Sequence, residues 1–404
     1  MKALLLTVAL LLGCVTVSSQ DKDTGIITVS TNDLSMVFSI SPDKKVVYNY
    51  FGDKFQDVSP FLHKKYKEQP DNGIGYAPVI YPAYGGRFFL NPALKLTHDD
   101  GVQTTELIYA AHQVKNIDNN RIETVIQLKD PLYPVFVNLN FTAYQKENVI
   151  CQSVSISHQE KNKLAVENIA SAYLPLHADS YYLTHFHGAW ASEMQLVEEQ
   201  LTPGVKRVES KKGIRTTQSE NSSFLLSLNG PANEDMGEVY AGSLAWSGNY
   251  LSSFEIDECG LLHVMSGMND FASTYNLEPG KTLQTPEMVW TYSSTGKGQV
   301  SRNLHDWSRN YALAHGDQEL SIVLNSWEGA YFDFNEKTIT DMIDDAAAFG
   351  VEMFVLDDGW FGNKYPRNSD KVGLGDWQVN RKKLPRGIDY LAKHAVSKGL
   401  KFGI

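Results

Sequence analysis

Residues 351–358 form a largely apolar run that ends in two adjacent carboxylates, Asp357 and Asp358, followed by Gly359 and Trp360. An apolar stretch with little alternation is typical of a strand buried on both faces of a parallel sheet. In α/β barrels, polar residues at the carboxyl end of such a strand bind ligands. The run therefore predicts a buried strand over 351–357 that carries a polar site at its carboxyl end.

The flanking segments extend this pattern into a strand, helix, strand, helix, strand series. Residues 322–327 predict the strand before it, and residues 400–404 begin a third. Such a series builds a parallel sheet through right-handed crossovers. The two helices show apolar residues at helical spacing, the first starting at Thr338 and ending at Gly350, the second ending at Gly399: Ile339, Met342, Ile343, Ala346 and Ala347, then Ile388, Leu391, Ala392, Ala395 and Val396.

From about residue 21 to 300 the chain has a different pattern. Residues 137–142 and 153–157 alternate apolar and polar side chains, and turn residues recur between such runs. These features predict a large antiparallel β-sandwich. The chain has 404 residues, too many for one typical core. We expect a signal peptide at 1–19, a β domain at 20–308, a connecting helix at 304–311, and the start of an α/β domain at 309–404.

The amino terminus predicts an exported protein. Lys2 precedes a short apolar run at 3–12 and small residues before Gln20, as in a signal peptide. Leu11 to Cys14 also resembles a bacterial lipobox, so soluble export and a lipoprotein anchored through Cys14 both stay open. The apolar run is too short for a transmembrane helix. The two remaining cysteines, Cys151 and Cys259, are expected to be buried thiols rather than a disulfide framework.

Charge and residue spacing exclude some partners. A net charge of -11 and the lack of a concentrated basic cluster argue against binding to nucleic acid. The cysteines and histidines show no metal-ligand spacing, and we expect His185 and His187 to be a structural pair. Asp357–Asp358 is also a divalent-cation pattern, but no further acidic group lies close in sequence to complete the six or more oxygen ligands, so a metal stays the minor alternative.

The residues alone leave two interpretations of the strand end. Asp357 and Asp358 could accept hydrogen bonds from a ligand such as a sugar, or could cap the following loop and bind buried backbone. Trp327 and Trp360 follow consecutive strands, where an indole can stack on a sugar ring or fill a core. Trp190 follows Gly188 and Ala189 and could project from a loop of the β domain or serve a structural role.

Several motifs in order resemble glycoside hydrolase family 36, the bacterial α-galactosidases. The resemblance covers almost the whole chain after the signal. In the α/β region it rests on residues 324–336, 354–362, 374–380 and 383–385, and in the β region on residues 188–193, 237–240, 246–249 and 277–287.

The resemblance implies an N-terminal β-supersandwich followed by the first three strands of a (β/α)8 TIM barrel. It implies that Trp190, Trp327, Asp357 and Asp358 bind the terminal galactose of an α-galactoside oligosaccharide such as raffinose or melibiose. Family members are retaining hydrolases with two catalytic carboxylates. Both belong to later barrel strands, so no catalytic residue is expected before Ile404, and we expect the chain to be an N-terminal fragment. No cofactor or metal is implied.

Three points remain open within this resemblance. An α-N-acetylgalactosaminidase or a galactosyl transferase of the same family is an alternative, and a noncatalytic carbohydrate-binding protein is another. Phe88 and Leu90 stand where many members carry Asp and Arg that reach a neighbouring subunit. A homo-oligomer is an expectation for the longer protein, but the contact made by that Asp and Arg is not expected.

Overall fold

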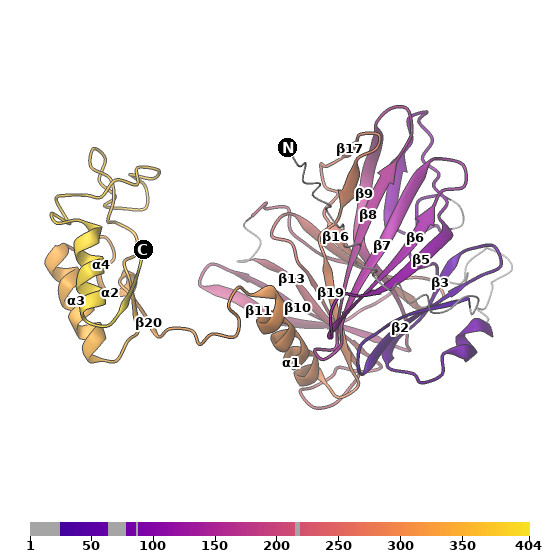
Figure 1. The fold of residues 1–404 in the computed structure, drawn as a ribbon, viewed down its shortest axis with the longest axis horizontal. Coiled ribbons are helices and arrows are strands. Elements are labelled where there is room, and N and C mark those ends of the chain that lie inside the picture. The colour runs from indigo at the N-terminus through magenta and orange to yellow at the C-terminus, as the bar shows by residue number, and fades with distance from the viewer. Residues whose placement is uncertain (1–24, 64–77, 86–87, 215–218) are drawn as a thin grey trace, which may run out of the picture. The chain divides into compact units, whose positions relative to one another are not determined.

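The computed structural model describes residues 25–63, 78–85, 88–214 and 219–404. The predicted signal peptide and Cys14 lie outside these ranges. The chain divides into two compact units, the first ending at Leu313 and the second running from Ala314 to Ile404. The sequence places this boundary at residue 308. The molecule consists mostly of β-sheet with few helices (Figure 1).

The first unit contains a ten-stranded antiparallel sheet. β11 lies at one end of it, and its residues are almost all exposed. In spatial order the strands are β11 (Ser192–Gln200), β10 (Tyr181–Ala189), β13 (Glu220–Leu228), β14 (Val239–Leu244), β19 (Met288–Ser293), β8 (Val149–His158), β7 (Val135–Tyr144), β6 (Arg121–Lys129) and β5 (Ile108–Asn116), with β18 (Thr282–Gln284) also paired to β8.

Two smaller sheets complete this unit. One has the order β12 (Gly204–Glu209), β15 (Tyr250–Ile256), β16 (Leu261–Met268), β9 (Leu164–His177) and β17 (Tyr275–Leu277), with β4 (Leu94–Thr97) also paired to β9. The other is β1 (Ile26–Ser30), β2 (Leu34–Ile40) and β3 (Val46–Asp53), followed by the 3-10 helix η1 (Ser59–His63).

All three sheets contribute to one hydrophobic core. Phe224 of the ten-stranded sheet meets Phe254 of the six-stranded sheet edge to face, with ring centroids 4.9 Å apart. Phe38 of the three-stranded sheet lies 5.6 Å from Phe141 of β7. The alternation predicted for 137–142 is present, because Val137, Leu139 and Phe141 are buried while Asn138 and Asn140 are partly exposed.

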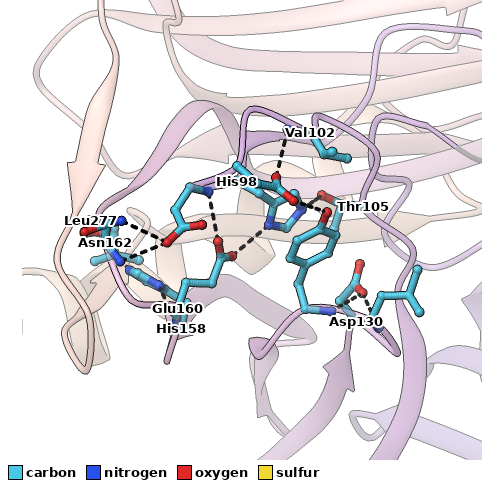
Figure 2. A network of polar contacts seen from close by, with 12 residues as sticks. His98, Val102, Thr105, Asp130, His158, Glu160, Asn162 and Leu277 are labelled. Atoms are coloured by element: carbon cyan, nitrogen blue, oxygen red, sulfur yellow. Dashed lines mark hydrogen bonds and ion pairs between the residues drawn. The ribbon is translucent and has the colours of Figure 1, made fainter.

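A buried polar network joins loops of this unit (Figure 2). The His98 ring binds the Glu160 carboxylate through Nδ1 at 2.7 Å and the Thr105 hydroxyl through Nε2 at 3.2 Å. Tyr133 stacks on the His98 ring, with centroids 3.7 Å apart. Asp130 accepts backbone N–H groups of its own turn and of Glu106. These bonds satisfy polar groups that would otherwise destabilise the buried loops.

The first unit ends in α1 (Lys297–Trp307) and one π-helical turn, η2 (Ser308–Ala312). The helix starts earlier than the predicted 304–311. Val300 and Leu304 face the sheet, where they pack near Val239 and Ala241 of β14. Cys151 is buried as predicted, whereas Cys259 is exposed, which corrects the prediction for that thiol. Cys259 lies in the turn between β15 and β16, where Glu258 beside it is also exposed.

The second unit is a three-stranded parallel sheet with helices. Its elements are β20 (Val323–Asn325), α2 (Trp327–Ala330), α3 (Glu336–Ala348), β21 (Met353–Val355), α4 (Ile388–Ser397) and β22 (Lys401–Gly403). The order is β20, β21, β22, with Leu324 opposite Phe354 and Phe354 opposite Phe402. Phe354 is fully buried between Ile339 and Ile343 of α3 and Leu391 of α4, all part of one cluster.

The predicted series of strands and helices is thus present, with shorter strands. The predicted start of the first helix is wrong by three residues. Asn335, and not Thr338, is the N-cap, because its side-chain oxygen accepts the Thr338 N–H at 3.0 Å. The helix then begins at Glu336.

Candidate functional site

The carboxyl ends of β20 and β21 bring the predicted polar residues of the second unit together. In the parallel register Asn325 lies opposite Val355, so the residues that follow each strand emerge at the same edge. Ser326 ties the two ends: its N–H donates to the Val355 carbonyl at 3.0 Å, and its hydroxyl accepts the Asp357 N–H at 3.0 Å. Asp357 and Trp327 therefore start from one rigid junction.

Asp357 is oriented by the neighbouring strand. The Asn325 side-chain amide donates to Oδ2 of Asp357 at 2.6 Å, while Oδ1 of Asp357 accepts the Asp358 N–H at 2.7 Å. A carboxylate has about four acceptor positions, so about two remain for a ligand. Asn325 Oδ1 also accepts the backbone N–H of Trp327 at 2.7 Å, so one side-chain amide connects the Asp357 carboxylate to the start of α2.

Asp358 has a different environment. It accepts the Gly359 N–H at 2.7 Å and forms a bidentate ion pair with Arg367, at 2.7 to 3.0 Å. This ion pair raises the pKa of Arg367. The Asp358 side chain keeps 25% exposure, while that of Arg367 is 6% exposed. Asp358 thus has less acceptor capacity left than Asp357.

The sequence also allowed Asp357 and Asp358 to cap the following loop. Each carboxylate does accept the backbone N–H of the next residue, as such a cap would. Such contacts use only part of the acceptor capacity of a carboxylate. Their ligand-binding role stays a prediction.

Trp327 begins α2 and is partly buried. Its ring meets Phe332 and Tyr331 edge to face, with centroids 5.0 and 5.2 Å apart. Edge-to-face contacts with other rings leave one face of an indole able to stack on the apolar surface of a ligand. Trp360 instead packs on Phe361 and, at 6.2 Å, on Trp377, which is 66% exposed.

Lys383 joins the loops that follow the two strands. Its ammonium donates to the Phe332 carbonyl at 2.7 Å and to the Gly359 carbonyl at 3.1 Å, and it lies 4.7 Å from the Phe334 ring centroid. Burial lowers the pKa of Lys383. This lysine fixes the spacing between the Trp327 side and the Asp358 side of the site.

Trp190 belongs to the other unit. It occupies the tight turn between β10 and β11, next to Ala191 with a φ of 59°, and is 80% exposed. Of the two alternatives for Trp190, the structure shows the projecting side chain, and its contact with a sugar stays a prediction. His185 of β10 binds the Glu199 carboxylate at 3.1 Å, in line with a structural role.

The residues that the structure brings together are Asn325, Trp327, Asp357 and Asp358, with Arg367 and Lys383. The sequence did not single out Asn325, Arg367 or Lys383. Asn325 had a usable signal, because it ends the strand that precedes the predicted parallel neighbour. Arg367 and Lys383 lie in an irregular segment whose spacing predicts no partner.

This group suits a ligand with several hydroxyl groups and one apolar face. Among the described residues no cluster of three His, Cys, Asp or Glu side chains could hold a metal ion. In the same part of the chain no helix is long and apolar enough to cross a membrane.

Comparison with known proteins supplies an independent line of information. A family model described as the glycosyl hydrolase family 36 N-terminal domain matches residues 44–278, and one described as Melibiase matches residues 282–404. The chain is 35% identical to alpha-galactosidase AgaA of Geobacillus stearothermophilus over 397 residues, which cover 92% of this chain and 54% of that protein. It is 31% identical to alpha-galactosidase Mel36A of Lactobacillus acidophilus, covering 81% of this chain and 46% of that protein.

Solved structures give the same picture. The crystal structure of AgaA matches with a TM-score of 0.87 and 32% identity, covering 93% of this chain and 55% of that one. A structure of an AgaA variant in complex with raffinose matches equally well. The chain spans about half the length of the curated relatives it matches.

Proposed function

The chain belongs to glycosyl hydrolase family 36, and on this premise we propose that it provides the galactose-binding part of a retaining α-galactosidase. In this proposal the first unit is the family's β-supersandwich and the second is the start of its (β/α)8 barrel. The catalytic carboxylates would come from later barrel strands. The complete enzyme here means residues 1–404 continued by the rest of such a barrel.

One observation supports this proposal above the others: Asn325, Trp327 and Asp357 share one strand-end junction, linked by hydrogen bonds of 2.6 and 2.7 Å. A pyranose has hydroxyl groups for the open acceptor positions of Asp357 and an apolar face for Trp327. Such contacts would hold the anomeric carbon between two carboxylates roughly 5 Å apart, as retention requires.

The substrate follows from the relatives. Those compared above are named α-galactosidases, and one was solved with raffinose. This favours hydrolysis of a terminal α-galactoside over three alternatives: hydrolysis of an α-N-acetylgalactosaminide, galactosyl transfer, and binding without catalysis. Trp190 is proposed as a further sugar contact in the complete enzyme.

Asp357→Asn in the complete enzyme tests the proposal. We expect kcat/KM on an aryl α-galactoside to fall by one to two orders of magnitude, because a charged acceptor worth about 1.5–3 kcal/mol is lost. The matched control is Asp389→Asn, which changes an exposed Asp at the start of α4 and should leave kcat/KM unaltered. Equal activity of the two variants would remove Asp357 from the sugar site.

A further inference from the structure

Arg367 is a buried guanidinium beside the candidate site that the proposed chemistry leaves without a role. Its Nε lies 2.9 and 3.0 Å from the two oxygens of Asp358, and its Nη2 lies 2.7 Å from Oδ2. Its Nη1 donates to the Val372 carbonyl at 2.8 Å. Four contacts from one side chain thus anchor the Asp358 carboxylate to the loop that contains Val372.

The same guanidinium reaches the tryptophan side of the site. It lies 5.5 Å from the centroid of the Phe332 ring and 6.0 Å from that of Phe361. Phe332 in turn supports Trp327 edge to face at 5.0 Å. The Arg367 guanidinium therefore binds the Asp358 carboxylate after β21 and lies near Phe332, the ring that supports Trp327 after β20.

The loop backbone is built closely around Arg367. The Arg367 N–H donates to the Phe361 carbonyl at 3.1 Å. A Cβ at Gly362 would lie 2.5 Å from the Tyr365 carbonyl oxygen, and one at Gly373 would lie 2.8 Å from the same atom. Both glycines have positive φ, of 87° and 74°, which other residues rarely adopt. The turns that place Arg367 thus depend on two glycines.

We propose that Arg367 is a positioning residue of the sugar site. It fixes Asp358 so that the remaining acceptor position of that carboxylate meets one sugar hydroxyl, and it supports the Trp327 wall through Phe332. It acts through these two side chains and does not itself contact the reacting atoms. The inference rests on the proposed function, since it concerns how that site is held.

Lysine would not replace arginine in this role. Only a planar guanidinium can make the bidentate contact with Asp358 and lie over an aromatic ring with the same atoms. Lysine keeps the charge but makes a single point contact. Arg367→Lys should therefore recover only part of the activity lost in Arg367→Met.

The chain contains a matched control. Arg386 binds Glu336 at 2.6 Å and lies 3.3 Å from the Tyr390 ring centroid, so it is also an arginine between a carboxylate and an aromatic ring. It belongs to the same unit, and these contacts are with Glu336 and Tyr390 and not with Asp357, Asp358 or Trp327. Arg386→Met reports what the loss of such an ion pair does by itself.

The decisive measurement uses monodeoxy aryl α-galactosides with the complete enzyme. The parent should discriminate strongly against the analogue that lacks the hydroxyl received by Asp358, and Asp358→Asn should abolish that preference. We expect Arg367→Met to reduce the same preference roughly tenfold, because a good hydrogen bond to a charged group is worth about that factor. Arg386→Met should retain the preference.

The outcomes separate the two proposals. No turnover of any α-galactoside by the folded parent would overturn the proposed function. Turnover with an unchanged deoxy preference in Arg367→Met, or equal effects of the Arg367 and Arg386 substitutions, would overturn the positioning role alone. Should Arg367→Met fail to fold, Arg367→Lys gives the same test, with a partial loss of the preference expected and full retention contradicting it.

Discussion

At the scale of single residues, neighbours decide what a side chain does more than its type. Asp357 and Asp358 are adjacent and chemically identical, yet one is oriented by an amide and the other by a guanidinium. Phe349 and Phe354 show the same contrast, since the first is 88% exposed and the second is fully buried. Substitutions at such pairs separate chemistry from location.

Phe354→Ala should destabilise the second unit by about 3–5 kcal/mol, because it leaves a cavity between α3, α4 and the sheet. The measurement is the denaturant midpoint of the transition that belongs to this unit. Phe349→Ala removes the same atoms from an exposed position and should change stability by no more than about 0.5 kcal/mol. Similar effects of both would show that the cluster around Phe354 is loosely packed.

Prediction from sequence succeeded where the residues of a single segment show the pattern of the structure that they form. The apolar run before Asp357 marks β21, and its place after a helix marks the parallel pairing. It failed for Arg367, whose partner lies nine residues back across irregular loop, where no periodicity fixes the fold. Strand order in the first unit was out of reach for a related reason, since β8 pairs with β19 far along the chain.

At the scale of elements, turns are stabilised by side chains that replace missing backbone partners. The hairpin of β15 and β16 is an example. Asp257 accepts the Cys259 and Leu261 N–H groups at 2.8 and 2.9 Å, and the His263 ring at 3.0 Å. Burial tends to raise the pKa of Asp257, but these hydrogen bonds outweigh it and the pKa is lowered.

The stability of this hairpin should therefore decrease as the solution becomes acidic. A carboxylate with a lowered folded pKa contributes its full stability above its unfolded pKa of about 3.9 and loses it as the pH falls further. At pH 7 the Tm of Asp257→Asn should be lower than that of the parent. The difference between the two Tm values should become smaller between pH 4 and pH 2.5. Asp389→Asn should show no such narrowing. A gap independent of pH would mean that Asp257 acts through its shape and not its charge.

At the scale of the whole molecule, two separate cores predict two unfolding events. The first unit encloses one cluster drawn from three sheets, and the second encloses its own smaller cluster. Calorimetry of the 404-residue chain should resolve two transitions, and Phe354→Ala should shift only one of them. A single transition that moves as a whole would show that the units unfold together.

Activity is the second test at this scale. If the proposed roles hold, the 404-residue chain binds sugar without hydrolysing it, because Asp357 and Asp358 serve as acceptors and neither is the nucleophile. Incubation with an aryl α-galactoside should release no phenol above the rate of the buffer. Clear turnover that disappears in Asp357→Asn would assign the chemistry to this strand end instead.

The exposed end strand of the large sheet has a consequence for the behaviour of the protein in concentrated solution. An unpaired strand edge invites another chain to extend the sheet. β11 carries Glu193, Glu198 and Glu199, of which Glu198 pairs with Lys297 and Glu199 with Lys206. Charged side chains on an end strand hinder the addition of a further strand, so these residues lower the tendency of the exposed hairpin around Trp190 to start sheet-like aggregation.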